Sequence, residues 1–338
     1  MWILGISALL GNSYVILKRV LPGRNTMPKR RGETARVQNV MIGNLALADS
    51  LMGVYMMIVA AADVYYRDQY AFFAEQWQTS MLCKIAGLLS VLSSEASVFF
   101  MTVISVDRFL ACVFPFSGVK LYFKSAVVAA VGVWAVSLFL SIVPVMIPDY
   151  FGNAFYGRST VCLALPLTNG RPDGWEYSVA LFLGVNLLAF VVMLACYGSI
   201  YYTVRSSSVS SGRGSISEVR AKELQLALRM AFLVFSDMCC WMPIIIMGIM
   251  SVTGLVNVPS ISYAWIAVFV LPLNSSLNPY LYTILTRELT RRQASKKARA
   301  ENSLTMSSNM TLHNVEEQNR NEKRKNMFIS NLKLFTCT

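Results

Sequence analysis

Seven long stretches of apolar residues, separated by shorter polar connections, run through most of the chain. They cover residues 1–20, 39–66, 83–113, 123–148, 177–204, 227–252 and 261–285. Each is long enough to cross the hydrocarbon core of a bilayer as a helix, which takes about 20 apolar residues. Lipid offers no partners to open backbone groups, and the alternating segments typical of a membrane barrel are not visible. The pattern predicts an all-α membrane protein, a seven-transmembrane helix bundle.

Basic residues gather in alternate connections between these stretches. The first, third and fifth connections hold Arg24, Lys29, Arg30, Arg31, Arg36, Lys120, Lys124, Arg205, Arg213, Arg220 and Lys222. The sixth connection, around residues 253–260, has no charge. Lys and Arg accumulate on the cytoplasmic side of membrane proteins. We therefore expect the N-terminus outside and the C-terminus in the cytoplasm.

The amino-acid composition argues against a soluble enzyme. Only 14% of the residues are charged, against roughly 25% in a soluble domain. The one histidine, His313, follows the last apolar stretch, which argues against histidine triads and multi-histidine metal sites. The net charge of +12 belongs mainly to the inner face, so nucleic-acid binding is a poor interpretation of it. We expect a membrane domain over residues 1–292 and a mostly disordered cytoplasmic tail over residues 293–338.

Ionisable residues lie inside three of the predicted spans. Asp49, Glu95 and Asp237 fall in the second, third and sixth stretches. A charge at the bilayer centre costs about 2.5–3.5 kcal/mol on insertion scales. Amide side chains accompany them at Asn12, Asn274 and Asn278. Hydrogen bonds between helices, worth about 0.6 kcal/mol each, are the plainer explanation for any single residue. Three carboxyls with amide partners favour a polar interior that holds a cation or protons.

Two cysteines fall on the side of the membrane where disulfides form. Cys83 opens the third span, and Arg108 closes it 25 positions later, a distance of about 38 Å along a helix. Cys83 is therefore extracellular and can pair with Cys162 of the fourth connection in an oxidising compartment. Such a bond would hold that connection over the bundle.

An acid–base pair is predicted at the inner face. Asp107 and Arg108 end the third span, and Glu223 precedes the sixth span at a comparable depth. Pairing of Arg108 with Glu223 would hold the inner ends together, and separating them would open a cytoplasmic cleft, as a switch requires. Pro243 is expected to bend the sixth helix.

The ordered set of motifs resembles the rhodopsin-like G-protein-coupled receptors. The matching segments are Gly11-Asn12, Asn44 to Asp49, Cys83, Asp107-Arg108-Phe109, Trp134, Cys240-Trp241-Met242-Pro243 and Asn278-Pro279-Tyr280-Leu281-Tyr282. Phe109 stands where the family usually has Tyr, and Ala189 replaces the usual proline of the fifth helix. The resemblance also implies a short amphipathic helix after the seventh span.

Within that class, several segments look most like the leucine-rich-repeat-containing receptors of the relaxin-peptide branch. Asp237 is informative, because most rhodopsin-like receptors have an aromatic residue there. The branch implies a peptide-hormone ligand captured by a repeat-bearing ectodomain, which we expect to be absent from this chain. It also implies a plasma-membrane location, a heterotrimeric G protein as partner, and no enzymatic activity. Arrestin and receptor kinases are further expected partners, and the surrounding lipid is in contact throughout.

The resemblance assigns roles residue by residue. Asp49, Ser97, Asn274 and Asn278 match the family's sodium pocket, with Na⁺ as an allosteric ion, and Asp237 should add a second carboxylate close to Asn278. Trp241 resembles the residue that changes rotamer beneath the outer cavity. Outward movement of the sixth helix is expected to admit the G protein. The remaining switch and coupling residues are Asp107, Arg108, Phe116, Tyr197, Glu223, Pro243, Pro279 and Tyr282.

Other membrane protein classes fit less well. A transporter or channel using the buried acids is the main alternative, but no internal repeat with broken helices is visible. An intramembrane aspartyl protease would need two aspartates, and Asp49 and Asp237 lack its glycine-flanked motif. A serine protease would need a histidine within the bundle.

Overall fold

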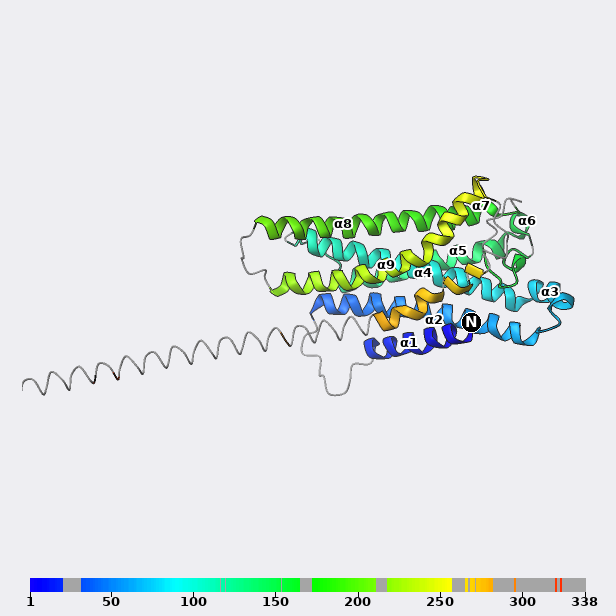
Figure 1. Cartoon of the computed structure of the whole chain (residues 1–338), viewed down its shortest axis with the longest axis horizontal. Coiled ribbons are helices and arrows are strands. Elements are labelled where there is room, and N and C mark those ends of the chain that lie inside the picture. The colour runs from blue at the N-terminus through cyan, green and yellow to red at the C-terminus, as the bar shows by residue number, and fades with distance from the viewer. Residues whose placement is uncertain are drawn as a thin grey trace, which may run out of the picture. The chain divides into compact units, whose positions relative to one another are not determined.

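The computed structural model places most of the chain as helices (Figure 1). It describes the chain apart from residues 21–31, 116, 119, 153, 165–171, 211–217, 257–264, 267 and 271, and beyond Leu281 only Ser295, Arg320 and Lys323. Two compact units are separated at Thr283. The described helices and their environment belong to the first unit, Met1–Thr283.

The long helices coincide with the predicted apolar stretches. They are α1 (Trp2–Val20), α2 (Glu33–Tyr65), α4 (Met81–Val113), α5 (Phe123–Met146), α8 (Asn186–Ser210) and α9 (Glu218–Val252). Five of the helical segments in the described residues are long and apolar enough to cross a membrane by length and composition. α1 has 19 residues, and the described helical residues of the seventh stretch are 265–266, 268–270 and 272–281.

Two helices begin earlier than the apolar pattern indicates. α2 starts at Glu33 and α9 at Glu218, whereas the apolar stretches start at residues 39 and 227. The added turns contain Glu, Arg, Lys, Ala and Gln, which favour helix in water as well as in lipid. Apolar patterning therefore finds the part of each helix in the bilayer and misses the part beyond it.

The second and fourth connections, which the sequence analysis places on the outer side, contain structure that the sequence pattern did not predict. They form α3 (Tyr70–Thr79), α6 (Pro148–Phe151), the 3₁₀ turn η1 (Tyr156–Arg158) and α7 (Trp175–Ser178). A π-helix, η2 (Val179–Val185), joins α7 to α8. π turns are rare and often mark functional positions. This one lies one turn before Ala189, the position where the expected proline is missing.

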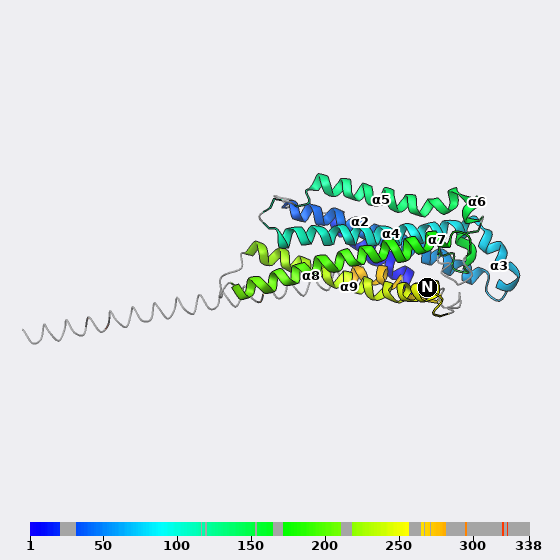
Figure 2. The same ribbon diagram turned by 90° about the horizontal axis from the view of Figure 1, so that it is seen from above.

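α4 is the central helix of the bundle. It packs against α2, α5, α8 and α9, while α1 packs on α2. Figures 1 and 2 agree that these helices run alongside one another. Pro243 lies inside α9, and Figure 1 shows the C-terminal half of this helix turning away from its initial direction, as expected for a helix with an internal proline.

α5 shows how packing selects side chains in this bundle. Its buried residues are mostly small and recur at helical spacing: Ala126, Ala130, Val133, Ser137, Ser141 and Pro144. Large side chains such as Val128 and Phe139 lie exposed on the opposite side. Lipid is as apolar as the core, so small residues at the contact let helices approach closely and gain dispersion energy. α5 thus presents its large side chains outward, as expected at a lipid boundary.

Candidate functional site: polar contacts through the helix bundle

Asp49 of α2 is the acceptor at the centre of the polar interior. Its Oδ1 accepts hydrogen bonds from Ser97 Oγ and Ser275 Oγ, both at 3.1 Å. Its Oδ2 accepts from Asn278 Nδ2 at 2.8 Å. The side chain is fully buried, where an unpaired carboxylate would be costly. One carboxylate therefore holds α2, α4 and the seventh helix together.

Ser275 was missed in the sequence analysis, although the pattern contained a signal for it. It directly follows Asn274 within an apolar stretch and is buried in the structure. Its backbone oxygen also accepts a hydrogen bond from Asn12 Nδ2 at 3.0 Å. Gly11 lies so close to Pro279 that a Cβ atom there would stand 2.8 Å from the proline ring. Asn12 thus holds α1 tightly against the seventh helix.

Asp237 of α9 pairs with an amide of the seventh helix. The sequence analysis expected it close to Asn278, and its Oδ1 accepts a hydrogen bond from Asn274 Nδ2, one turn earlier. Asn278 Nδ2 donates to Asp49. Asp237 and Asn274 are both buried. The two carboxylates therefore hold neighbouring turns of the same helix.

Several buried oxygens in this layer have no hydrogen-bond donor within the described part of the chain. They are Asp237 Oδ2, Asn274 Oδ1 and Asn278 Oδ1. All three oxygens can accept a hydrogen bond or coordinate a cation. Buried acceptors in proteins usually have a hydrogen-bond partner, so these oxygens are available to one.

Glu95 has its own amide partner on another helix. Asn186 Nδ2, at the start of α8, donates to Glu95 Oε1 of α4 over 3.1 Å. Both side chains are fully buried, and Glu95 Oε2 and Asn186 Oδ1 lack donors among the described residues. Asn186 was also missed, although an amide inside a long apolar run is itself a signal. The pair ties α4 to α8 directly after the π-helix.

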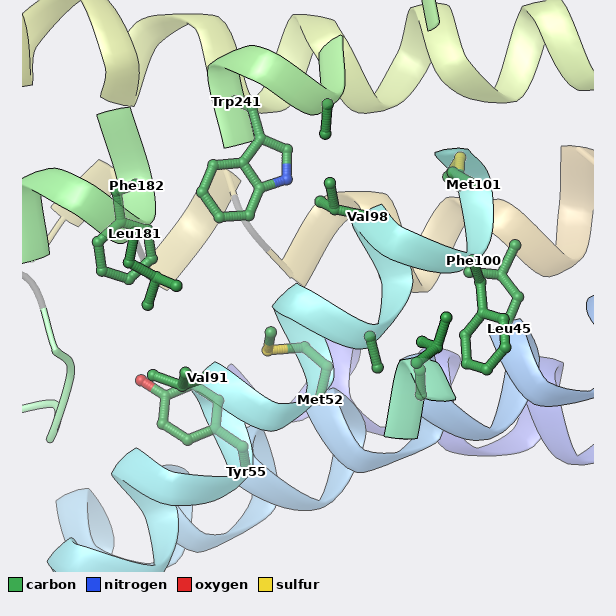
Figure 3. Packing of buried hydrophobic residues seen from close by; sticks show 14 of the residues in the cluster. Leu45, Met52, Tyr55, Val91, Val98, Phe100, Met101, Leu181, Phe182 and Trp241 are labelled. Carbon is green, nitrogen blue, oxygen red and sulfur yellow. The ribbon is translucent and has the colours of Figure 1, made fainter. Parts of the chain in front are cut away.

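Trp241 lies in an aromatic contact between α8 and α9. Its ring centroid is 6.0 Å from that of Phe182, with the two rings nearly parallel at 27°, and 6.4 Å from that of Phe190. Figure 3 shows the indole facing Phe182. Trp241 is one helical turn from Asp237 on α9. A movement of the indole would therefore reach the polar layer through a rigid turn of helix.

The face that the sequence analysis places on the inner side contains the ion pair expected between α4 and α9. Arg108 Nη1 lies 2.7 Å from Glu223 Oε2, and Nη2 bonds Asp107 Oδ2. The Arg108 side chain is 3% exposed and that of Glu223 is 20% exposed. Removing one partner from such a pair leaves a desolvated charge and costs several kcal/mol, about 3–5 when fully buried. This contact holds the inner ends of α4 and α9 together.

Tyr197 lies beside this pair on α8. The Ser105 hydroxyl lies 3.5 Å from the Tyr197 hydroxyl. A small apolar cluster around Cys112, Ile200 and Ala227 joins the inner ends of α4, α8 and α9. Phe116 and Tyr282 lie outside the described residues, so their expected positions stay predictions.

The outer face is held by a disulfide between Cys83 and Cys162, which confirms the expected pairing. Neighbouring backbone oxygens of the same connection accept hydrogen bonds from Trp77 Nε1 at 2.9 Å and from the Tyr55 hydroxyl at 2.8 Å. Tyr156 fits over Gly87 of α4, where an added Cβ would stand 2.4 Å from its ring. The fourth connection is thus fixed to α2, α3 and α4.

Aromatic rings complete this outer layer. Phe151 packs edge-on against Phe155 and Tyr177. On the aqueous side, Tyr150 donates a hydrogen bond to Glu176 at 2.9 Å, and this bond raises the pKa of the tyrosine hydroxyl above its usual value. The rings and the disulfide together cover the outer end of the bundle.

Known proteins similar to this chain are membrane receptors. The sequence profile described as 7 transmembrane receptor (rhodopsin family) matches residues 27–282. The G-protein coupled receptor GRL101 of Lymnaea stagnalis is 41% identical over 286 residues, which is 84% of this chain and 24% of the relative. Relaxin receptor 2 of Canis lupus familiaris is 35% identical, over 84% of this chain and 37% of the relative. Relaxin receptor 1 of Homo sapiens is 33% identical, over 85% of this chain and 36% of the relative.

The chain spans about a quarter to a third of the length of these relatives. A solved structure, squid rhodopsin, superposes with a TM-score of 0.61 at 18% identity, over 83% of this chain and 74% of that one. This likeness confirms the seven-helix fold predicted from the apolar pattern. With the profile match over most of its length, the chain belongs to the rhodopsin family of seven-transmembrane receptors.

Proposed function

We propose that this chain is the membrane-spanning signalling unit of a relaxin-like peptide-hormone receptor. It passes an extracellular signal to heterotrimeric G proteins by outward movement of the inner end of α9. The observation that carries this proposal is the Arg108–Glu223 ion pair, which joins α4 to α9 at the inner face. The relaxin receptors among the relatives support the peptide-hormone class.

The ion pair suits a two-state switch because of its surroundings. Arg108 is almost fully buried, whereas Glu223 is partly exposed and can regain water when α9 moves. Among the described residues, the small cluster around Cys112 and the Ser105–Tyr197 hydroxyl contact lie at this end of the bundle with the pair. A modest difference in binding free energy can shift the balance between two states of such a switch.

The described contacts include a route by which the outer end could act on α9. The Cys83–Cys162 disulfide fixes the outer connection to α4. Phe182 follows α7 and stacks on Trp241, which lies one turn from Asp237 on α9. A displacement of the outer connection can therefore bias α9 through packed side chains and a rigid helix.

The polar layer fits an allosteric sodium ion. Asp49, Ser97, Asn274 and Asn278 would hold it, because they combine a carboxylate with neutral oxygens, two of which lack donors among the described residues. Hard cations prefer such oxygen ligands. When bound, the ion supplies positive charge between α2, α4 and the seventh helix, which favours the state in which these helices are close.

The surrounding assembly belongs to the same proposal. The orientation, with the N-terminus outside and the C-terminus in the cytoplasm, is inferred from the distribution of basic residues, and the plasma-membrane location from the receptor family. Hormone capture requires an ectodomain, and the relatives are about three to four times as long as the matched region. Receptor kinases and arrestin would act on the cytoplasmic side.

The direct experiment is the substitution Glu223→Gln in membranes that contain the full chain. Removing one charge of the pair should raise the ligand-independent rate of nucleotide exchange on a responsive Gα subunit about tenfold, the factor for 1.4 kcal/mol. A panel covering the Gα classes is assayed at matched surface amounts. The control is Glu75→Gln, an exposed glutamate of α3 on the outer side. Absence of exchange above empty membranes with every Gα, for both the wild type and the variant, would contradict the proposal.

A further inference from the structure

The connection between α4 and α5 is held at its end by carboxylates from two different helices. Asp107 Oδ1 of α4 accepts a hydrogen bond from the Leu121 backbone N–H at 3.3 Å. Glu33 Oε1 of α2 accepts one from the Phe123 backbone N–H at 2.7 Å. Phe123 is the first residue of α5. The sequence analysis gave Glu33 no role.

Glu33 acts as a helix cap supplied by a neighbouring helix. The first N–H groups of a helix have no partner within it and need one from elsewhere. Tyr122, at the N-cap position of α5, makes no capping hydrogen bond with its side chain. A carboxylate at this end also interacts favourably with the helix dipole. Glu33 therefore supplies the acceptor that the local sequence of α5 lacks.

Arg36 strengthens the same contact from the next turn of α2. Its guanidinium lies 4.2 Å from the centre of the Phe123 ring and 3.9 Å from Glu33 Oε2. A guanidinium over an aromatic face is attracted by the ring's negative surface. The backbone and the side chain of Phe123 are thus both held by α2, by hydrogen bonding and by stacking.

The other end of the connection is attached to α4. Phe114 packs edge-on against Phe109, with ring centroids 5.6 Å apart, and the Ser117 hydroxyl donates to the Phe114 backbone oxygen at 2.9 Å. The connection therefore begins on α4 and ends on α2. Its position depends on both attachments.

The two carboxylates differ in what else they bind. Asp107 also bonds Arg108, which pairs with Glu223 of α9, so its contact is coupled to the state of that ion pair. Within the described part of the chain, Glu33 contacts Phe123 and Arg36 and makes no hydrogen bond or ion pair with that network. Opening the inner face would perturb the first attachment and leave the second in place.

We propose that Glu33 is a positioning residue for G-protein engagement. It holds the end of the α4–α5 connection against α2 when Arg108 and Glu223 separate, so that this connection presents a fixed surface to the Gα subunit. The inference rests on the proposed function and adds to it a contact on a helix that does not move with α9.

Two substitutions distinguish the effect of the length of the Glu33 side chain from the effect of its charge. Glu33→Asp keeps the charge but is one methylene too short for the Phe123 N–H. Glu33→Gln keeps an acceptor oxygen at the same reach and loses the charge. Ser125→Ala, an exposed residue in the first turn of α5, is the control. Each is made in the full chain carrying Glu223→Gln and compared at equal surface amounts, so that a variant with poor folding is recognised by its yield.

The main measurement is the rate of nucleotide exchange as a function of G-protein concentration. Glu33→Asp should raise the half-saturating concentration about fivefold, the size of effect that losing a helix cap usually has, with the maximal rate unchanged. Glu33→Gln and Ser125→Ala should stay within about twofold of the background. Amide hydrogen exchange over residues 121–126 should accelerate in Glu33→Asp only.

The outcomes distinguish the two proposals. Faster amide exchange without a change in the half-saturating concentration would overturn the positioning role, and unchanged amide exchange would overturn the contact itself. One outcome is that the chain that carries only Glu223→Gln activates a Gα subunit while the added Glu33→Asp changes nothing that is measured. In that case the positioning role of Glu33 fails and the proposed function stands. If neither the wild type nor the background activates any Gα subunit, the proposed function fails and the positioning role with it.

Discussion

The two ends of this bundle are built differently. At the outer end, a disulfide, the Tyr156 ring over Gly87 and hydrogen bonds from Trp77 and Tyr55 fix the fourth connection. At the inner end, the described residues join α4 and α9 by an ion pair and a small apolar cluster. Under the proposed function, the covalently fixed end is the one that would receive a signal, and the end held by the ion pair is the one that would release it.

The largest expected effect comes from removing the outer covalent bond. Cys83→Ser should lower delivery of the chain to the cell surface at least about threefold, because losing a native disulfide typically costs about 2–5 kcal/mol. Surface labelling against total protein measures it. Cys239→Ser, at an exposed free cysteine, is the matched control. Normal delivery of Cys83→Ser would show that the outer end is stable without the bond.

A steric change tests the same end without touching the disulfide. Gly87→Ala would place a Cβ 2.4 Å from the Tyr156 ring, and the ring must move. Overpacking of this kind costs about 1–3 kcal/mol. We expect a lower melting temperature in detergent. Gly132→Ala, where the added Cβ has open space, should melt like the wild type. A Gly87→Ala chain that melts at the wild-type temperature would mean that the ring is loosely held.

Removing sodium probes the layer between the two ends. Replacing Na⁺ with choline at constant ionic strength should raise ligand-independent nucleotide exchange about threefold, because an ion contributing under 1 kcal/mol to the inactive state is lost. Asp49→Asn should abolish this sensitivity, since the carboxylate that would hold the ion is gone. Equal sodium responses of the wild type and Asp49→Asn would show that sodium does not act through the Asp49 carboxylate.

The smallest expected effect concerns a contact away from both ends. Trp134 Nε1 of α5 donates to Asn44 Oδ1 of α2 at 2.9 Å. Trp134→Phe should reduce the free energy of unfolding by about 1 kcal/mol, the usual net value of one hydrogen bond, and leave basal nucleotide exchange unchanged. Thermal unfolding and the exchange assay measure both. A rise in basal exchange would show that the freedom of the inner end extends to α5.

Much of the fold follows from the sequence because the bilayer restricts it so strongly. Apolar length alone located the long helices, and the family match confirms the seven-helix fold. The pairing of Cys83 with Cys162 followed from their side of the membrane. α3 and the π-helix were not predicted, because neither changes the apolar pattern. Both depend on how the outer connections pack, which a single sequence does not display.

The residues of the site also divide into those that the sequence indicates and those that it does not. Asp49, Asp237 and Glu95 were recognisable because a carboxyl in lipid is costly wherever it lies. Their partners were harder to predict, because a serine or an amide is common in membrane helices and only three-dimensional position selects Ser275 or Asn186. Phe116 and Tyr282 stay predictions. That Asp237 pairs with Asn274 depends on how α9 and the seventh helix are rotated against each other, which the sequence does not show.

The hydrogen bonds of Asp49 have a consequence for how the bundle can rearrange. One oxygen is shared by serines from two helices, and the other binds Asn278 on the second of those helices. Rotating the seventh helix alone would strip two donors from the carboxylate at once while leaving it buried. A stepwise path would therefore pass through a high-energy intermediate, so α2, α4 and the seventh helix must exchange their contacts cooperatively.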